Sequence, residues 1–281
     1  MDERHKAEKA LTVQDIPQET METVCFHALG LIDRNREYLQ QHLQRGGSRD
    51  PAAMAALGDI AVASNRLGHV LTELMSLLDC VRGTQQPELR VLDLCALLDC
   101  IVREARPVLR AGGVTLRCRV PGEGGCRVLA DRGYAEQICV RLLSNALRAC
   151  GPSGEVELVL CRDGGQWQLT VLDNGCGLNE PQDLEQRRRF LGGARAGLLL
   201  CREYCRLMGW SLELQDRPEG GAQARVTLPA LPDDLPPAQT VELCGADLYA
   251  DPAQSDHVRK LVLQELRTVP SLETAPQREK D

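Results

Sequence analysis

Residues 171–180 read VLDNGCGLNE, an apolar run that ends abruptly in Asp173 and two glycines. Asp, Asn and Gly are common turn formers, so the simplest interpretation of residues 173–177 is a tight turn at the end of a strand. A second interpretation is the wall of a ligand pocket, because glycines let the backbone pass close to a flat ligand and a carboxylate can accept a hydrogen bond from it. The segments on either side of the motif decide between the two.

The segment before this motif has the pattern of a helix followed by a hairpin. Asp131 is placed to cap a helix over about residues 132–150, whose apolar residues recur at steps of three and four, and Asp93 is placed to cap an earlier helix. Asn145, in RLLSNALRA, lies on the side of its helix away from the apolar face. The alternating runs EVELVLC and WQLTVLD then predict two strands, joined by the turn residues DGG. The motif therefore ends a strand that closely follows an Asn-bearing helix.

The segment after the motif is a loop of about 20 residues that runs to Ala196, and loops of this length are usually functional or disordered. Its end, FLGGARAGLLL, opens a helix, and such a helix N-terminus offers free N–H groups to phosphates. An amide oxygen such as that of Asn145 can ligate magnesium, and the carboxylate of Asp173 can accept the exocyclic amine of adenine. The three features together indicate a nucleotide pocket, although a turn or a surface amide explains each one alone.

The clearest periodic pattern lies nearer the N-terminus, over residues 57–81, after a first helical pattern over about 19–43. Residues that are apolar except for one serine recur there at alternating steps of three and four: Leu57, Ile60, Ser64, Leu67, Leu71, Leu74, Leu78 and Val81. Such a narrow stripe is typical of coiled coils and four-helix bundles. One hairpin does not easily cover two such stripes, so we expect a homodimer that forms a four-helix bundle. His69, beside the stripe, is most simply a structural residue.

The remaining strands complete a second domain, because VTLRCRV alternates as a strand does, and SLELQ and AQARVTLP predict a final hairpin. The predicted fold class is α+β: an N-terminal helical hairpin, followed by a two-layer α/β sandwich with a mixed, mostly antiparallel sheet. We expect a charged tail over residues 1–18, the hairpin over 19–86, the sandwich over 87–230 and an acidic, Pro-rich, flexible tail over 231–281. That tail contains one short helical pattern at about 257–266.

Composition excludes several classes of protein. The net charge of -7 argues against a nucleic-acid partner, which requires a basic face. No apolar run approaches the roughly 20 residues of a membrane span, and no apolar signal segment follows the charged N-terminus, so we expect a soluble, cytoplasmic protein. The 13 cysteines are an odd number without a C-x-x-C pair, which predicts packed free thiols rather than disulfides or a zinc site.

The order and spacing of these motifs resemble those of sensor histidine kinases, from about residue 21 to residue 229. LGDIAVASNRLGHVLTELMSLLDCVRG resembles the second helix of the family's dimerisation and phosphoacceptor hairpin. LADRGYAEQICVRLLSNALRA resembles the N box of its ATP-binding domain, a type of domain shared with gyrase, Hsp90 and MutL. LDNGCGL is similar to the G1 box, GGARAGLLLCREYCRLMGWSLEL to the G2 box with its following helix, and RPEGGAQARVTLP to the closing hairpin.

The resemblance implies a histidine kinase that binds ATP with Mg²⁺. The residues carried over by position are Asn145 for magnesium, Arg148 for phosphate, Asp173 for adenine, Gly175 and Gly177 for the base site, and Gly193 and Gly197 beside the triphosphate. His27 falls where the family has its phosphoacceptor, on the first helix of the hairpin, at a position that we expect to be partly exposed. The partner that the resemblance implies is the receiver domain of a response regulator, whose aspartate would accept the phosphoryl group.

The chain departs from the family at positions that serve catalysis. Ala28 follows His27 where the family has an acidic residue, and the usual proline further on is absent. Arg141 replaces the first N-box asparagine and Arg195 replaces the middle glycine of the G2 box, while Phe190 stands in for the F box of a shortened loop. Three functions therefore stay open: an active histidine kinase, a catalytically degenerate dimeric scaffold, and a histidine phosphotransferase with a vestigial ATP-binding domain.

Overall fold

The computed structural model describes residues 18–45, 51–83, 86–121, 126–150, 154–178, 194–229, 231, 249, 251–266 and 269. The chain divides into two compact units, Met1–Gln85 and Gln86–Asp281, which we name the hairpin unit and the α/β unit. No helix in the described part of the chain combines the length and the hydropathy that crossing a bilayer requires.

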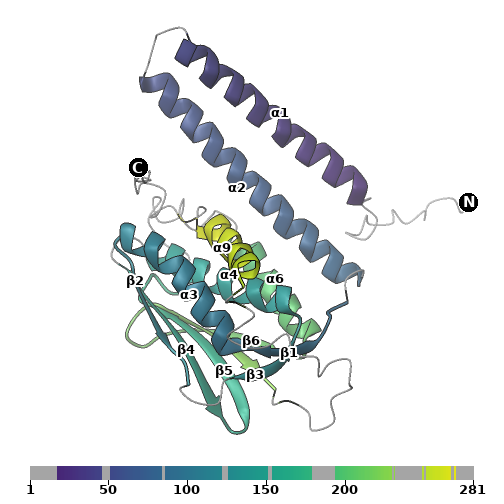
Figure 1. Ribbon diagram of the computed structural model, residues 1–281, viewed down its shortest axis with the longest axis vertical. Coiled ribbons are helices and arrows are strands. Elements are labelled where there is room, and N and C mark those ends of the chain that lie inside the picture. The colour runs from purple at the N-terminus through teal and green to yellow at the C-terminus, as the bar shows by residue number, and fades with distance from the viewer. Residues whose placement is uncertain are drawn as a thin grey trace, which may run out of the picture. The chain divides into compact units, whose positions relative to one another are not determined.

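The hairpin unit consists of two long helices, α1 (Gln18–Arg45) and α2 (Pro51–Arg82), which pack side by side (Figure 1). Both were predicted, and both are longer than predicted. The stripe on α2 divides into two sets. Leu57 and Ser64 are buried, whereas Ile60, Leu67 and Leu74 are 41%, 48% and 37% exposed. Each set repeats every seven residues, so half of the stripe remains uncovered within one chain.

The α/β unit is built on a five-stranded sheet with the strand order β2-β4-β5-β7-β6. The strands are β2 (Thr115–Arg119), β4 (Glu155–Asp163), β5 (Gln166–Asp173), β6 (Ser211–Asp216) and β7 (Ala222–Leu228). The β2–β4 pair is parallel, and the β4–β5, β5–β7 and β6–β7 pairs are antiparallel, which confirms the predicted mixed sheet. A second, antiparallel sheet of β1 (Arg90–Asp93) and β3 (Arg127–Ala130) was not predicted as a pair.

Three helices cover one face of the large sheet: α3 (Leu94–Ala111), α4 (Arg132–Cys150) and α6 (Ala194–Leu207) (Figure 1). The predicted caps are confirmed. The Asp93 carboxylate accepts hydrogen bonds from the second and third backbone N–H groups that follow it, at 2.9 and 3.4 Å. Asp131 accepts one from the N–H three residues on, at 3.0 Å. Both aspartates thus satisfy backbone donors that an uncapped helix start would leave without partners.

Strand alternation decides which side chains face these helices. The inward residues of β4 and β5 are buried and aliphatic: Val156, Leu158, Leu160, Leu169 and Val171. Asp173 continues the same inward series at the end of β5 and is also buried. Because side chains alternate between the two faces of a strand, the carboxylate of Asp173 lies on the face of the sheet that the helices cover.

The cysteines of the described chain are free thiols, as predicted. Burial raises the pKa of the Cys95 thiol to about 11 and that of the Cys205 thiol to about 12. Both thiols therefore stay protonated at neutral pH and pack as small apolar side chains.

A final helix, α9 (Pro252–Leu266), corrects the prediction of a flexible C-terminal tail. The short helical pattern at 257–266 was right in kind but too short. Val258, Val262 and Leu266 lie on one side of α9 and are buried, and the helix packs against α3 and α4. The acidic, Pro-rich composition around these residues predicted a flexible tail, whereas their helical spacing indicated the packed helix that the structure contains.

Candidate ATP-binding site

The motif that ends β5 folds around the carboxylate of Asp173. Its Oδ1 accepts hydrogen bonds from the backbone N–H groups of Gly175, at 2.8 Å, and Ala222, at 3.1 Å. Burial raises the pKa of the Asp173 carboxyl, against the opposing effect of these two hydrogen bonds and of the Arg217 charge. None of the described residues donates a hydrogen bond to Oδ2. That oxygen is therefore the acceptor that a donor group on a ligand would meet.

Glycines let the backbone close tightly around this carboxylate. A Cβ on Gly175 would overlap the backbone carbonyl of Ala149, at the end of α4. Gly177 has a φ of +79°, and a Cβ there would lie 2.6 Å from Oδ1 of Asp216. Residues with side chains rarely adopt that φ. The interpretation of the motif as a turn is thus correct for its backbone, and the same turn encloses the Asp173 carboxylate.

The turn lies directly against the helix that carries Asn145, as the order of the motifs predicted. The N–H of Cys176 donates a hydrogen bond to the carbonyl of Ala149, at 3.3 Å. Nη1 of Arg148, the residue before Ala149, donates to Oδ1 of Asn145 at 3.4 Å. The Nδ2 group of Asn145 is buried and has no acceptor among the described residues. A buried donor without a partner is costly, so it fits an acceptor supplied by a ligand, such as a phosphate oxygen.

The other predicted site residues are placed only in part. Gly197 lies near the start of α6 and is buried, and α6 packs against α4. Arg195 lies in the first turn of α6, but its side chain is outside the described structure, as are all atoms of Gly193 and Phe190. His27 lies in α1, the first helix of the hairpin, and its side chain is likewise outside the described structure.

Three residues of this site were missed by the sequence analysis, all of them beside the hairpin between β6 and β7. Nη1 of Arg217 donates to the backbone carbonyl of Asp173 at 2.7 Å, and Oδ1 of Asp216 accepts from the N–H of Leu178 at 2.7 Å. Gly221 has a φ of +85°, and a Cβ there would overlap that same carbonyl of Asp173. The sequence showed a glycine-rich turn at this place, but nothing local linked it to a motif about 40 residues earlier.

Arg141, the first N-box position, also has defined partners. Its Nε donates to Oε1 of Gln137 at 3.0 Å, and its Nη1 lies 3.4 Å from Oε1 of Glu265, at the end of α9. Nη2 of Arg148 lies 3.9 Å from the other oxygen of Glu265. The sequence analysis did not connect Glu265 with the predicted site.

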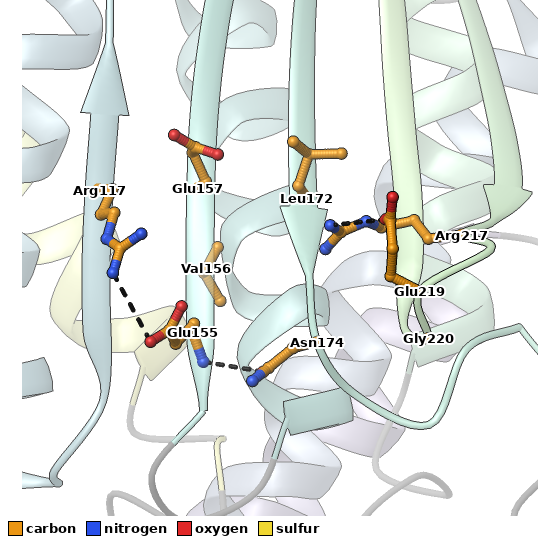
Figure 2. A pocket seen from close by; sticks show the side chains of 9 residues that line it. All are labelled: Arg117, Glu155, Val156, Glu157, Leu172, Asn174, Arg217, Glu219 and Gly220. Atoms are coloured by element: carbon orange, nitrogen blue, oxygen red, sulfur yellow. Dashed lines mark hydrogen bonds and ion pairs between the residues drawn. The ribbon is translucent and has the colours of Figure 1, made fainter.

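A cavity of about 270 Å³ lies on the other face of the sheet (Figure 2). Its walls include Arg117 and Glu155, whose charged groups lie 3.7 Å apart, and the outward-facing Glu157 and Leu172. Strand alternation places these residues opposite the inward Asp173. Asn174 of the motif and Arg217, which donates to the Asp173 carbonyl, both line this cavity, whereas the inward Asp173 does not.

Residues 130–232 match the family described as histidine kinase-, DNA gyrase B-, and HSP90-like ATPase. Among curated proteins, the alginate biosynthesis sensor protein KinB of Pseudomonas aeruginosa is 31% identical over 171 residues, which are 59% of this chain and 29% of KinB. The chain is thus similar to sensor histidine kinases, and residues 130–232 match the ATPase family that includes theirs. Asn145, Asp173, Gly175 and Gly177 lie within the matched ATPase region.

Two solved histidine kinases have the same fold. AdeS of Acinetobacter baumannii aligns with a TM-score of 0.52 at 16% identity, over 73% of this chain and 98% of AdeS. ThkA, solved in complex with the response regulator protein TrrA, aligns with a TM-score of 0.54 at 18% identity, over 77% of this chain and 63% of that chain. The α+β fold class, with its mixed sheet, is therefore that of histidine kinases.

Proposed function

We propose that this protein is a histidine kinase that binds Mg-ATP in its α/β unit, phosphorylates His27 within a homodimer, and passes the phosphoryl group to a response-regulator aspartate. The proposal rests on the carboxylate of Asp173. Its Oδ1 accepts two backbone hydrogen bonds, its Oδ2 accepts none from the described residues, and the glycine turn places it next to the helix of Asn145. Its Oδ2 would accept the adenine amine, and Gly175 and Gly177 would let the base lie close to the backbone. Relatives that match this region are histidine kinases, which supports ATP as the ligand.

The triphosphate would extend from the adenine toward α4 and the start of α6. Arg148 would bind phosphate oxygens, and the buried Nδ2 of Asn145 would donate to another, which supplies its missing partner. Gly193 and Gly197 would flank the phosphates at the N-terminus of α6, where helix N–H groups favour anions. When Arg148 turns from Oδ1 of Asn145 to the phosphates, Oδ1 would ligate Mg²⁺, and a bound Mg²⁺ would neutralise charge that develops on the phosphate oxygens.

The chemical step that we propose is a phosphoryl transfer to an imidazole nitrogen of His27. The nitrogen would attack the γ-phosphorus, the bond to the bridging oxygen of ADP would break, and the imidazole proton would leave to solvent. A receiver aspartate would then attack the same phosphorus and break the P–N bond. Because Ala28 replaces the acid that normally takes the proton, we expect autophosphorylation to be slower by a factor of about 10² to 10⁴ than with a neighbouring base. The complex of ThkA with TrrA supports a response regulator as the class of partner.

The homodimer rests on the uncovered half of the α2 stripe. Ile60, Leu67 and Leu74 repeat every seven residues and are exposed in the hairpin unit. Two hairpins that bring these residues together would bury them in a four-helix bundle. The bundle would also hold two copies of His27 in one assembly.

Incubation of the full chain with γ-³²P-labelled ATP and Mg²⁺ tests the proposal. We expect slow, acid-labile and alkali-stable label on the wild type, and none on His27→Ala. His42→Ala is the matched control, since His42 is an exposed histidine on the same helix, and it should label like the wild type. Label that persists in His27→Ala would contradict the assignment of the phosphoacceptor.

The second candidate function is a dimeric scaffold without kinase activity. Ala28 favours it, as does the pairing of Arg141 with a carboxylate of the chain itself. This function predicts nucleotide binding without labelling of any histidine. A phosphotransferase would instead take label from a phosphorylated donor protein and not from ATP.

A further inference from the structure

One face of α4 carries Arg141 beside Asn145 and Arg148, the two residues that the proposed function directs at the triphosphate. Arg141, Asn145 and Arg148 stand at i, i+4 and i+7, a spacing that aligns side chains along one side of a helix. Both arginines are buried, at 5% and 7% exposed. Guanidinium groups on one helix face form a site for an anion that can accept several hydrogen bonds.

A carboxylate of the same chain already lies against this face. The two oxygens of Glu265 approach Nη1 of Arg141 at 3.4 Å and Nη2 of Arg148 at 3.9 Å, so one acid bridges the two arginines. Arg148 in turn donates to Asn145 at 3.4 Å. Glu265 thus belongs to the same polar cluster as the asparagine proposed to ligate Mg²⁺.

Contacts near the N-terminal end of α9, away from the arginines, also hold this helix against the rest of the α/β unit. The hydroxyl of Tyr249 donates to Oε1 of Glu136 at 3.3 Å, and Nη2 of Arg103 donates to the hydroxyl of Ser255 at 3.0 Å. Val258 and Val262 are fully buried between these contacts and Glu265. The position of Glu265 therefore follows from the docking of a whole helix, which orders it more than a single surface ion pair would.

We propose that α9 is an autoinhibitory element, and that the Glu265 carboxylate occupies the arginine pair in place of the ATP phosphates. The inference rests on the proposed function, which directs Arg148 and Asn145 at the triphosphate. A carboxylate and a phosphate accept hydrogen bonds from the same guanidinium donors, and two anions at one buried cluster repel each other. ATP binding and the docked position of Glu265 consequently oppose each other, and a partner that releases α9 activates the kinase.

The inference predicts that Glu265→Gln raises the affinity for ATP, because the amide keeps the size of the side chain but removes the negative charge that would repel the phosphates. We expect a gain of about fivefold or more in the full chain, measured by calorimetry. The affinity for adenosine, which has no phosphate, should not change. Asp256→Asn is the matched control: it removes an acid from the exposed side of the same helix and should leave both affinities unchanged.

The coupling must also act in reverse, since linkage is reciprocal. In the wild type, ATP but not adenosine should speed hydrogen exchange at the backbone amides of α9, and in Glu265→Gln this effect should shrink. An unchanged or weaker ATP affinity in Glu265→Gln, in a variant whose thermal unfolding shows a folded protein, overturns autoinhibition. That result means that Glu265 positions the arginines instead. If neither the wild type nor the variant binds ATP or adenosine, the proposed function fails along with the inference. If both bind adenosine equally well but Glu265→Gln does not bind ATP more tightly, only the role of Glu265 is wrong.

Discussion

The carboxylate of Asp173 organises the turn with one oxygen and faces the proposed base site with the other. Oδ1 accepts hydrogen bonds from two backbone N–H groups, those of Gly175, two residues on, and Ala222, 49 residues on. A carboxylate is acceptor-only when it is ionised, so Oδ2 is suited to a donor such as the amine of adenine. Structure and binding can therefore be separated at this residue by changing one atom.

Asp173→Asn should keep the fold and lose ATP. Its amide oxygen can still accept from Gly175 and Ala222, but its NH₂ group then faces the adenine amine, donor against donor. We expect ATP to bind at least about tenfold more weakly, since an unsatisfied buried donor costs roughly 1–3 kcal/mol. Calorimetry measures this, with Asp163→Asn, an exposed acid at the far end of the sheet, as the control that should bind like the wild type.

The same variant should alter the dependence of stability on pH. Burial raises the pKa of Asp173 in the folded protein above its ordinary value of 3.8. At pH values between 3.8 and this raised pKa, the folded protein therefore binds more protons than the unfolded chain. The contribution of Asp173 to the free energy of unfolding therefore falls as pH rises through that interval. Asp173→Asn should be relatively more stable at pH 7 than at about pH 4, measured by urea unfolding. A difference that stays constant with pH would contradict the burial of an ionised carboxylate.

Gly175 is required because its Cα lies against the backbone at the end of α4. Gly175→Ala should cost about 1–3 kcal/mol of stability, since the Cβ would meet a carbonyl that cannot rotate away as a side chain can. Gly133→Ala in the same helix is the control, because its Cβ would meet its nearest neighbour at 3.4 Å and alanine favours helices. Urea unfolding should find the control as stable as the wild type or more stable. Equal stability of both variants would contradict the close approach of turn and helix.

At the scale of elements, sequence patterns predicted the features that depend on residues close together in the chain, such as helix caps and strands. Asp93 and Asp131 were predicted as caps because a cap acts within three residues, and the strands of the main sheet follow from alternation alone. The docking of α9 could not be predicted in this way. Tyr249 meets Glu136 across 113 residues, and no periodicity connects a tail to a helix so far away. The contact of Glu265 with Arg141 was missed for the same reason.

The packing of α9 predicts that its buried side chains stabilise the α/β unit. Val258→Ala should lower the free energy of unfolding by about 1–3 kcal/mol, because it opens a cavity at a fully buried position. Arg259→Ala, at the next and exposed residue, should change it by less than about 0.5 kcal/mol. Chemical unfolding of both variants decides the matter, and equal stabilities would mean that α9 does not dock as described.

At the scale of the whole molecule, the sequence was informative wherever one motif had to be near the next. The order of Asn145, Asp173 and the glycines predicted a common site. In the structure, the turn after Asp173 contacts the end of α4, the helix that carries Asn145. The order of motifs carries no information about assembly, because both partners of a homodimer have the same sequence. The exposed stripe of α2 is the part of the chain that bears on this question.

Leu67→Glu should convert a dimer into a monomer. Leu67 is 48% exposed, at the middle of the series Ile60, Leu67 and Leu74, so in a four-helix bundle it would meet its own copy or a neighbour in an apolar layer. A carboxylate there would be buried beside a second one, which costs several kcal/mol for each ion. We expect sedimentation velocity to give the dimer mass for the wild type and half of it for Leu67→Glu. Asn65→Glu places the same charge on another exposed position of α2 and should stay dimeric. A monomeric wild type, or a Leu67→Glu dimer, would show that the stripe is covered in another way.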